Sequence, residues 1–271
     1  MKIFRLLGAA YDSFLLFSYP PAQATYGGKQ MLNIFNRKTV ARGLAMAAAI
    51  IFIPVSNAAL VDYSQNFEGM TQADTGVLGA DGWLVFGNVF STGGDYLYGY
   101  GPFIAPNACA AGLDPAFSCV AAGEGGPAQG AQQLVAFSDY KNFDHAIGNI
   151  IESNLFQEQS IGTADVGKTM SFNFDAKKGD IAGSSTASAF IKTVDPNNGY
   201  ALTNFITFDT TDIPTTWGTY GLDILIDFSL DGQLLQFGFL NTATNYEPSG
   251  VIYDNVNFGA VVPIPAATWL F

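Results

Sequence analysis

Histidine, cysteine and charged side chains are scarce in this sequence. Its 271 residues include one histidine, two cysteines and 13% charged residues. A single histidine argues against a histidine-ligated transition-metal centre. The sequence contains no GxSxG elbow and no GxGxxG after a strand, so it supports neither a serine hydrolase nor a dinucleotide-binding enzyme. We therefore expect His145 to be an exposed loop residue.

Basic residues are few and unevenly placed. There are 11 Lys and Arg against 23 Asp and Glu, and the net charge is -12. Six of the basic residues precede residue 60 beside one acid, Asp12, so the remainder holds 5 basic and 22 acidic residues. An acidic surface repels phosphate backbones, so we expect no nucleic-acid partner. Its carboxylates are the ligands that Ca²⁺ prefers. A glycosidase needs two suitably placed carboxylates, and with 22 acidic residues available the sequence does not identify such a pair.

From Ala59 onward, short strand-like segments recur and helical periodicity is nearly absent. Apolar and polar residues alternate in 169–176, where every second residue from Met170 is apolar. Asn198-Gly199 predicts a two-residue hairpin turn and Asp231-Gly232 a second tight turn. The pattern predicts one all-β domain over 59–259, an antiparallel β-sandwich, with 95–133 as a long surface excursion. Strands are expected at 134–138, 153–157, 169–176, 187–194, 201–208, 220–227, 233–240 and 251–258.

The front of the chain has the order of a secretory signal. Basic Arg37, Lys38 and Arg42 precede the apolar run GLAMAAAIIFIPV, and small residues follow up to Ala58. This order predicts a signal peptide over 31–58 that signal peptidase cleaves after Ala58. The competing interpretation is a buried core helix, and the run is short for a membrane span. We interpret residues 1–30 as a mis-assigned upstream start, with translation beginning at Met31.

An exported protein would meet an oxidising compartment, in which its two cysteines are expected to form a disulfide. Cys109 and Cys119 lie ten residues apart, and an even pair in an oxidising compartment indicates a disulfide. A two-thiol metal site is the alternative, but the neighbouring sequence adds no further cysteine or histidine ligand.

Aromatic residues are the candidate ligand-binding groups. Tyr96, Tyr98 and Tyr100 follow one another at every second position, so a strand would place them on one face. Trp217, Tyr220 and Tyr246 stand in loop-like segments. Aromatic faces stack on the apolar faces of sugars, and these six residues are the predicted polysaccharide site. The alternative is that the rings pack the sheet.

The last residues carry a resemblance to a sorting signal. VPIPAATWLF, residues 262–271, resembles the start of a PEP-CTERM signal. The resemblance implies a Gram-negative bacterial protein that is exported and processed by an exosortase, located in the periplasm, on the outer envelope surface or in an extracellular or biofilm matrix. Such signals continue with an apolar span and a basic cluster, so we interpret 260–271 as the start of a truncated signal. The residues that carry the resemblance are Val262, Pro263, Pro265, Ala266, Ala267, Trp269, Leu270 and Phe271.

A second resemblance concerns the domain itself. The segments NFEG at 66–69, Gly82-Trp83 and YDNV at 253–256 are similar to galactose-binding-like jelly rolls among carbohydrate-binding modules. The resemblance favours a jelly roll and implies a structural Ca²⁺ with Glu68 and Asp254 as ligands. The alternative is that both are solvated turn carboxylates. We expect a non-catalytic protein that binds polysaccharide or exopolysaccharide. A polysaccharide hydrolase or lyase and a purely structural matrix protein remain the alternatives.

Overall fold

The computed structural model describes residues 59–110 and 116–261. The predicted upstream segment 1–30, the signal peptide with its cleavage site at Ala58, and the sorting motif at 262–271 lie outside the described residues. Within the described ranges, no helix has both the length and the apolar character needed to cross a bilayer.

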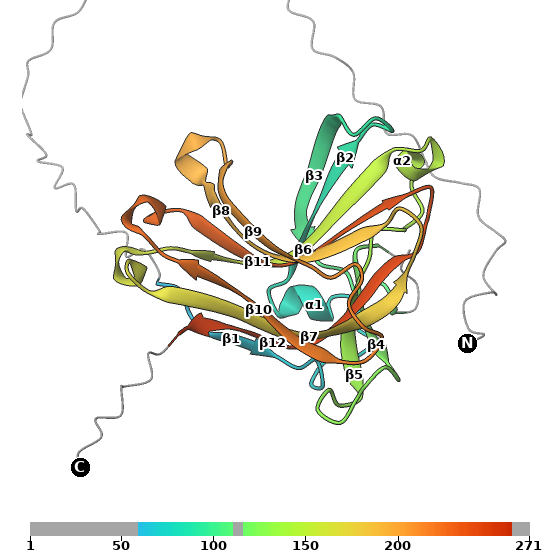
Figure 1. The fold of residues 1–271 in the computed structure, drawn as a ribbon, viewed down its shortest axis with the longest axis horizontal. Coiled ribbons are helices and arrows are strands. Elements are labelled where there is room, and N and C mark those ends of the chain that lie inside the picture. Colours follow the sequence, from blue (N-terminus) through green and yellow to red (C-terminus); the bar gives the residue numbers. More distant parts are fainter. Residues whose placement is uncertain (1–58, 111–115, 262–271) are drawn as a thin grey trace, which may run out of the picture. The chain divides into compact units, whose positions relative to one another are not determined.

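Two antiparallel sheets form the domain (Figure 1). Sheet A has the order β10-β7-β12-β5-β4, with β1 paired to β12, and sheet B has the order β3-β2-β6-β11-β8-β9. The chain crosses repeatedly from one sheet to the other, as in a jelly roll. The predicted all-β sandwich is confirmed. Sheet A contains β1 (Tyr63–Gln65), β4 (Ser118–Ala122), β5 (Gln132–Ala136), β7 (Thr169–Ile181), β10 (Gly218–Leu225) and β12 (Ser249–Ala260). Sheet B contains β2 (Leu84–Phe90), β3 (Tyr96–Ile104), β6 (Ile150–Ser160), β8 (Thr186–Asp195), β9 (Ala201–Asp209) and β11 (Leu234–Thr244).

The core lies between the sheets and is rich in aromatic rings. Phe172 and Phe174 of β7 are at most 1% exposed, which confirms the predicted alternation in this segment. Phe239 of β11 stacks on Tyr253 of β12, with ring centroids 3.6 Å apart. Each such ring contributes roughly 1.5–3 kcal/mol on full burial, so this inter-sheet layer accounts for much of what holds the sheets together.

The chain turns at both predicted places, 198–199 and 231–232, but the residues and strands involved differ from the prediction. The β8–β9 hairpin turns through a short 3₁₀ helix (Pro196–Asn198), and the positive φ angles fall on Gly199 and Tyr200, at 62° and 60°. A two-residue Asn198-Gly199 turn is therefore wrong. The second turn is tight, with Gln233 N–H donating to Leu230 O at 3.0 Å, but it joins β10 of sheet A to β11 of sheet B after the 3₁₀ turn Phe228–Leu230.

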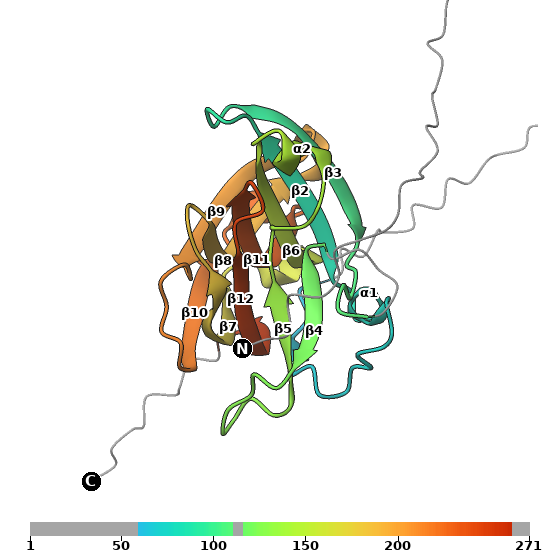
Figure 2. The ribbon, with the colours of Figure 1, turned by 90° about the vertical axis from the view of Figure 1, so that its right-hand side faces the viewer.

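The predicted surface excursion over 95–133 is wrong, because it contains β3 and β4. Glycines and Pro102 made β3 resemble a loop in the sequence. Gly99 is needed for close packing, since a Cβ there would lie 2.6 Å from the Phe86 ring. Figure 2 shows β4 running beside β5, where it completes the edge of sheet A.

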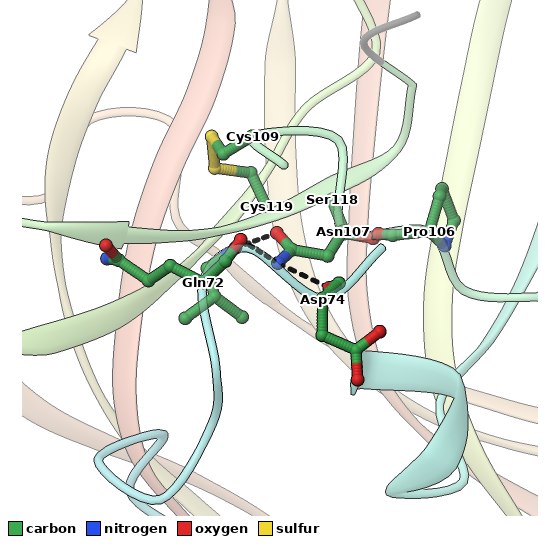
Figure 3. The surroundings of a disulfide bond; sticks show 8 residues. Gln72, Asp74, Pro106, Asn107, Cys109, Ser118 and Cys119 are labelled. Atoms are coloured by element: carbon green, nitrogen blue, oxygen red, sulfur yellow. Dashed lines mark hydrogen bonds between the residues drawn. A yellow bond between two sulfur atoms is a disulfide. The ribbon is translucent and has the colours of Figure 1, made fainter. Parts of the chain in front are cut away.

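The predicted disulfide between Cys109 and Cys119 is present, with the two Cα atoms 5.1 Å apart. Beside it, fully buried Asn107 donates to Gln72 O and Asp74 O, both at 3.0 Å (Figure 3). Its side-chain oxygen accepts from Val120 N–H of β4 at 2.9 Å. One amide therefore ties three separate segments together next to the cross-link.

Sheet B is strongly curved. In Figure 1 the β2–β3 and β8–β9 hairpins rise on opposite sides of β6 and β11, away from sheet A. We call the side of sheet B that is turned away from sheet A the outer face. The curvature makes this face concave.

Candidate functional site

An apolar floor covers the middle of the outer face. Phe156 of β6, Phe190 of β8 and Leu240 of β11 form a cluster separate from the main core, and they are 2%, 0% and 8% exposed. Leu84 and Phe86 of β2 pack against them. Lys192 and Phe205 also lie against Phe190, so neighbouring side chains of the concave face cover the cluster.

A line of hydrogen bonds runs across this floor. Lys192 Nζ of β8 donates to Asn154 Oδ1 of β6 at 2.7 Å. Asn154 Nδ2 donates to Glu152 Oε1 at 3.1 Å, and Asn88 Nδ2 of β2 donates to the same oxygen at 2.8 Å. We call these four residues the polar row. Because Asn154 is fully buried, its amide is fixed by its two partners, and the row is preorganised.

Lys192 has an unusual environment for a surface lysine. Its Nζ lies 4.4 Å from the centroid of the Phe190 ring and 5.7 Å from that of Phe205. Burial lowers the pKa of Lys192 to about 8, and the attraction of Glu152 offsets only part of this effect. Within the described ranges, no carboxylate oxygen lies within 4.0 Å of this ammonium group.

Exposed aromatic rings stand on both sides of the polar row. Phe205 of β9 is 47% exposed, and Tyr96 of β3 is 58% exposed. Tyr96 packs edge-on against Phe90 of β2, with ring centroids 5.7 Å apart. The outer face therefore offers flat apolar surfaces with amide, ammonium and carboxylate groups between them.

Tyr96 reaches this face because of a β-bulge. Tyr98 pairs with Val89, whereas Tyr96 pairs with the next residue, Phe90, so β3 contains one extra residue at this point. The bulge turns Tyr96 to the outer face while Tyr98 and Tyr100 point toward the core side. The prediction that the three tyrosines share one face is therefore wrong, since a strict two-residue period does not survive an inserted residue.

Tyr98 and Tyr100 belong to a second cluster at the end of the sandwich. Tyr98 donates to Asp144 Oδ2 at 2.5 Å, which raises the pKa of Tyr98 to about 12. The hydroxyls of Tyr100 and Tyr140 are in contact, and burial raises the pKa of both. These hydroxyls are committed to protein partners.

Tyr246 joins the same cluster through His145. The two rings stack with centroids 5.3 Å apart, and Tyr246 donates to Asn142 O at 2.7 Å. His145 lies in the short helix α2 (Phe143–Ala146) and is 1% exposed, so the expected exposed loop histidine is wrong. Burial lowers the pKa of His145, and Asn142 caps the helix by accepting from His145 N–H. The His145 ring packs against Tyr140 and Tyr246, and its Nε2 lies 2.9 Å from Ser138 O, so the buried ring has both apolar and polar contacts.

The remaining two predicted aromatics lie on sheet A. Trp217 immediately precedes β10, donates to Glu124 O at 3.1 Å and lies 5.3 Å from Lys177 Nζ. Tyr220 lies within β10 and packs on Phe208, with centroids 4.9 Å apart. The structure therefore divides the six predicted residues among three places, and only Tyr96 lies on the outer face of sheet B.

One of the two predicted metal ligands, Asp254, is a buried acidic group on sheet A, and the other, Glu68, is an exposed carboxylate whose charge acts on it. Asp254 of β12 is fully buried, and its Oδ2 has no hydrogen-bond partner. Burial, with smaller contributions from the charges of Glu68 and Asp175, raises the pKa of Asp254 to about 7. Glu68 is exposed and accepts from the N–H groups of Ala131 and Gln132, both at 2.7 Å. A solvated turn carboxylate is thus wrong for Asp254. Across residues 59–110 and 116–261, no set of three or more acidic, His or Cys side chains is arranged to hold a metal ion.

Sequence reasoning missed the polar row and Phe205. The one available signal was a lysine inside the apolar strand AFIKTV, on the same face as Phe190. A lysine next to a buried phenylalanine on one strand face indicates a polar group held over an apolar floor. Asn88, Glu152 and Asn154 come from strands whose order in the sheet is not readable from the sequence.

No protein-family model and no curated protein matches the sequence. Among solved structures, the chain is similar to a Stig cyclase from Fischerella sp. TAU, with a TM-score of 0.41, 12% identity, and coverage of 74% of this chain and 98% of that one. It is also similar to the CBM22-1 xylan-binding domain from Paenibacillus barcinonensis, with a TM-score of 0.36, 10% identity and coverage of 77% and 98%. The enzymatically active domain of Bacteriophage CBA120 tailspike protein 4 has a TM-score of 0.40, 12% identity and coverage of 70% of this chain. This chain spans about a fifth of it, 21%. Likenesses at this level assign no family to the chain.

Proposed function

We propose that this protein binds polysaccharide on the outer face of sheet B and does not cleave it. The observation that carries the proposal is the polar row, flanked by the exposed rings of Phe205 and Tyr96. Sugar rings have apolar faces and a rim of hydroxyls. Aromatic rings take the faces, while amide and carboxylate groups fixed in advance take the hydroxyls without a large ordering cost.

The extended shape of the face favours a chain over a single sugar. The row draws on the neighbouring strands β2 and β6 and on β8, which β11 separates from β6, and the two exposed rings come from the opposite edge strands β3 and β9. A ligand that contacts all of these groups must cross several strands. A polymer does so with successive sugar units, each adding a small contact.

Substitution of the flanking rings tests this proposal. We expect the double variant Phe205→Ala and Tyr96→Ala to lose most retention in affinity electrophoresis through a panel of polysaccharides, because both rings are exposed and their loss spares the core. Trp217→Ala, on sheet A, is the matched control and should bind like the wild type. Equal retention by all three proteins would remove the outer face as the site.

Two alternatives have distinct outcomes in the same experiment. Release of reducing ends or of unsaturated products from a retained polymer would identify a hydrolase or a lyase. Absence of retention on every polymer would leave a structural matrix protein.

We also propose that a Ca²⁺ ion binds beside Asp254 and Glu68. The support is the unpartnered Oδ2 of a buried carboxyl with other carboxylates nearby, since a cation would neutralise this charge. The ion would supply structural stabilisation and no reaction step. Thermal melting with EDTA and with added CaCl₂ tests the site, and unchanged melting would refute it. Glu68→Gln should weaken the calcium response, while Glu124→Gln, whose carboxylate pairs with Lys177, should not.

Export and sorting complete the proposal. The support is the basic, apolar and small-residue order before Ala59 together with the disulfide, which forms in oxidising compartments. We propose cleavage by signal peptidase after Ala58 and recognition of the 262–271 motif by an exosortase in a Gram-negative envelope or matrix. N-terminal sequencing of the mature protein checks the first step, and a first residue other than Ala59 would contradict it.

A further inference from the structure

We infer that Lys192 receives a carboxylate of the bound glycan, so that the polymer is an acidic polysaccharide with sparsely spaced acidic sugars. This inference rests on the proposed glycan binding at the outer face and names the class of ligand for that site.

Lys192 differs from the other lysines of residues 59–110 and 116–261 in its surroundings. Lys168, Lys177 and Lys178 each have a carboxylate oxygen within 3.0 Å, and Lys141 is an exposed loop residue. Lys192 is partly buried over two phenylalanine rings and has no such partner in the described part of the chain. An ammonium group taken out of water without a counter-ion is destabilised, and an anion placed beside it removes that penalty.

The ammonium group of Lys192 has hydrogen-bond donors to spare. An ammonium group has three N–H donors, and one of them is used by Asn154 Oδ1. Asn154 is fully buried and also donates to Glu152, so it holds the ammonium in place without neutralising it. A ligand carboxylate would accept from the remaining donors in a charge-assisted hydrogen bond, which is about twice as strong as one between neutral groups.

Acidic groups of the protein limit how densely charged the bound polymer can be. Glu152 lies in the same row, but its Oε1 already accepts from Asn88 and Asn154. The domain as a whole is acidic, with a net charge of -12 for the full chain. A polymer with an acid on every sugar would bring further carboxylates near Glu152 with no second ammonium group to receive them, whereas one isolated carboxylate can be placed at Lys192. Charges beyond roughly 8 Å are largely screened at physiological salt, so the groups next to the ligand carboxylate determine which polymer binds.

The test compares one polymer with and without its acid groups. Oligosaccharides of gellan, in which glucuronate is separated by neutral sugars, are titrated into the full chain at 0.15 M NaCl by calorimetry, beside their carboxyl-reduced counterparts. We expect reduction of the carboxyl group to weaken binding roughly 10- to 100-fold, the range of a hydrogen bond to a charged group. Polygalacturonate, acidic at every sugar, should bind more weakly than gellan.

Variants of the lysine assign the effect to this residue. Lys192→Met keeps the apolar stem and should bring the two gellan forms to within about threefold of each other, while Lys192→Arg should keep the preference. Lys141→Met removes the same charge from a loop and is the matched control. If Lys192→Met does not fold, the inference is still tested by the affinities of the wild type and of Lys192→Arg for gellan and for its carboxyl-reduced form.

Each outcome is informative. Equal binding of both gellan forms by the wild type would overturn the inference and leave glycan binding intact. A preference that survives Lys192→Met would also overturn it. Failure to bind gellan, its reduced form and a neutral panel of dextran, xylan and cellulose oligosaccharides would refute the proposed function itself.

Discussion

Replacing Asp254 by Asn should stabilise the protein at neutral pH in metal-free buffer. Asp254 is fully buried, one of its oxygens has no partner, and its pKa is raised from 3.8 to about 7. Asn has nearly the same shape and keeps an oxygen to accept from Asn255 N–H, a bond of 2.6 Å in the wild type. It carries no charge at any pH.

The raised pKa of Asp254 determines how the stability of the wild type changes with pH. Near pH 4 and below, the carboxyl is protonated in the folded chain, and no charge is buried. As the pH rises toward 7, the unfolded chain releases its proton while the folded chain retains it, so the wild type loses stability across this window. Above about pH 7 the loss is complete and constant.

The magnitude follows from the two pKa values. The difference between 3.8 and about 7 corresponds to about 4 kcal/mol. Relaxation around the buried carboxylate and screening of the exposed Glu68 charge by water both reduce this value, so we expect roughly half, about 2 kcal/mol. Asp254→Asn should then match the wild type near pH 4 and exceed it by about 2 kcal/mol near pH 8.

Urea denaturation followed by tryptophan fluorescence, in buffers from pH 4 to 8 with EDTA, measures this difference. A variant that is no more stable than the wild type near pH 8 would refute the reasoning, because it would mean that the ionised carboxylate is favourably held. Added CaCl₂ should reverse the order, since it stabilises only the wild type if the proposed ion is present. Asp223→Asn, on the exposed side of β10, is the control and should show no pH-dependent gain.

Three further predictions concern stability. Asn107→Ala should destabilise the domain by about 2–4 kcal/mol, because it removes three hydrogen bonds from a buried amide; a loss below about 1 kcal/mol in urea denaturation would contradict this. Reduction of the Cys109–Cys119 disulfide by dithiothreitol should cost about 2–3 kcal/mol for its ten-residue separation, and an unchanged melting curve of the reduced protein would count against it. Phe190→Ala should cost about 3–5 kcal/mol although it lies on the outer face, whereas Phe205→Ala should cost less than about 1 kcal/mol; similar losses in chemical denaturation would mean that the face is not concave.

The sequence was sufficient where local pattern and tertiary environment agree. The alternation in 169–176 survives because β7 pairs along its length with β10 and packs one face on the core. It was insufficient in 96–104, where glycines resemble a loop and a bulge shifts the face of Tyr96. That bulge depends on the register with β2, which no residue of β3 encodes alone.

The candidate site was harder to predict for a related reason. Lys192, Glu152 with Asn154, and Asn88 lie on three strands that are far apart in the chain. Each is an ordinary polar residue in an alternating strand, and its special environment arises from strand order and sheet curvature. His145 shows the same effect, because its burial depends on stacking with Tyr246, about a hundred residues further along the chain.

The two polar clusters of the domain are physically separate, and this constrains how they can influence each other. The polar row lies on the outer face of sheet B, whereas Asp254 lies on the outward side of sheet A and faces Asp175 on the neighbouring strand. The aromatic core stands between them, and its stacked rings form a closely packed layer. Packed sheets lie roughly 10 Å apart, and both groups lie on outward sides, so the direct Coulomb interaction of a cation at Asp254 with Lys192 is weakened by distance. Its effect on glycan binding would therefore act through the fraction of folded protein, and glycan affinity measured well below the melting temperature should be the same with and without the ion.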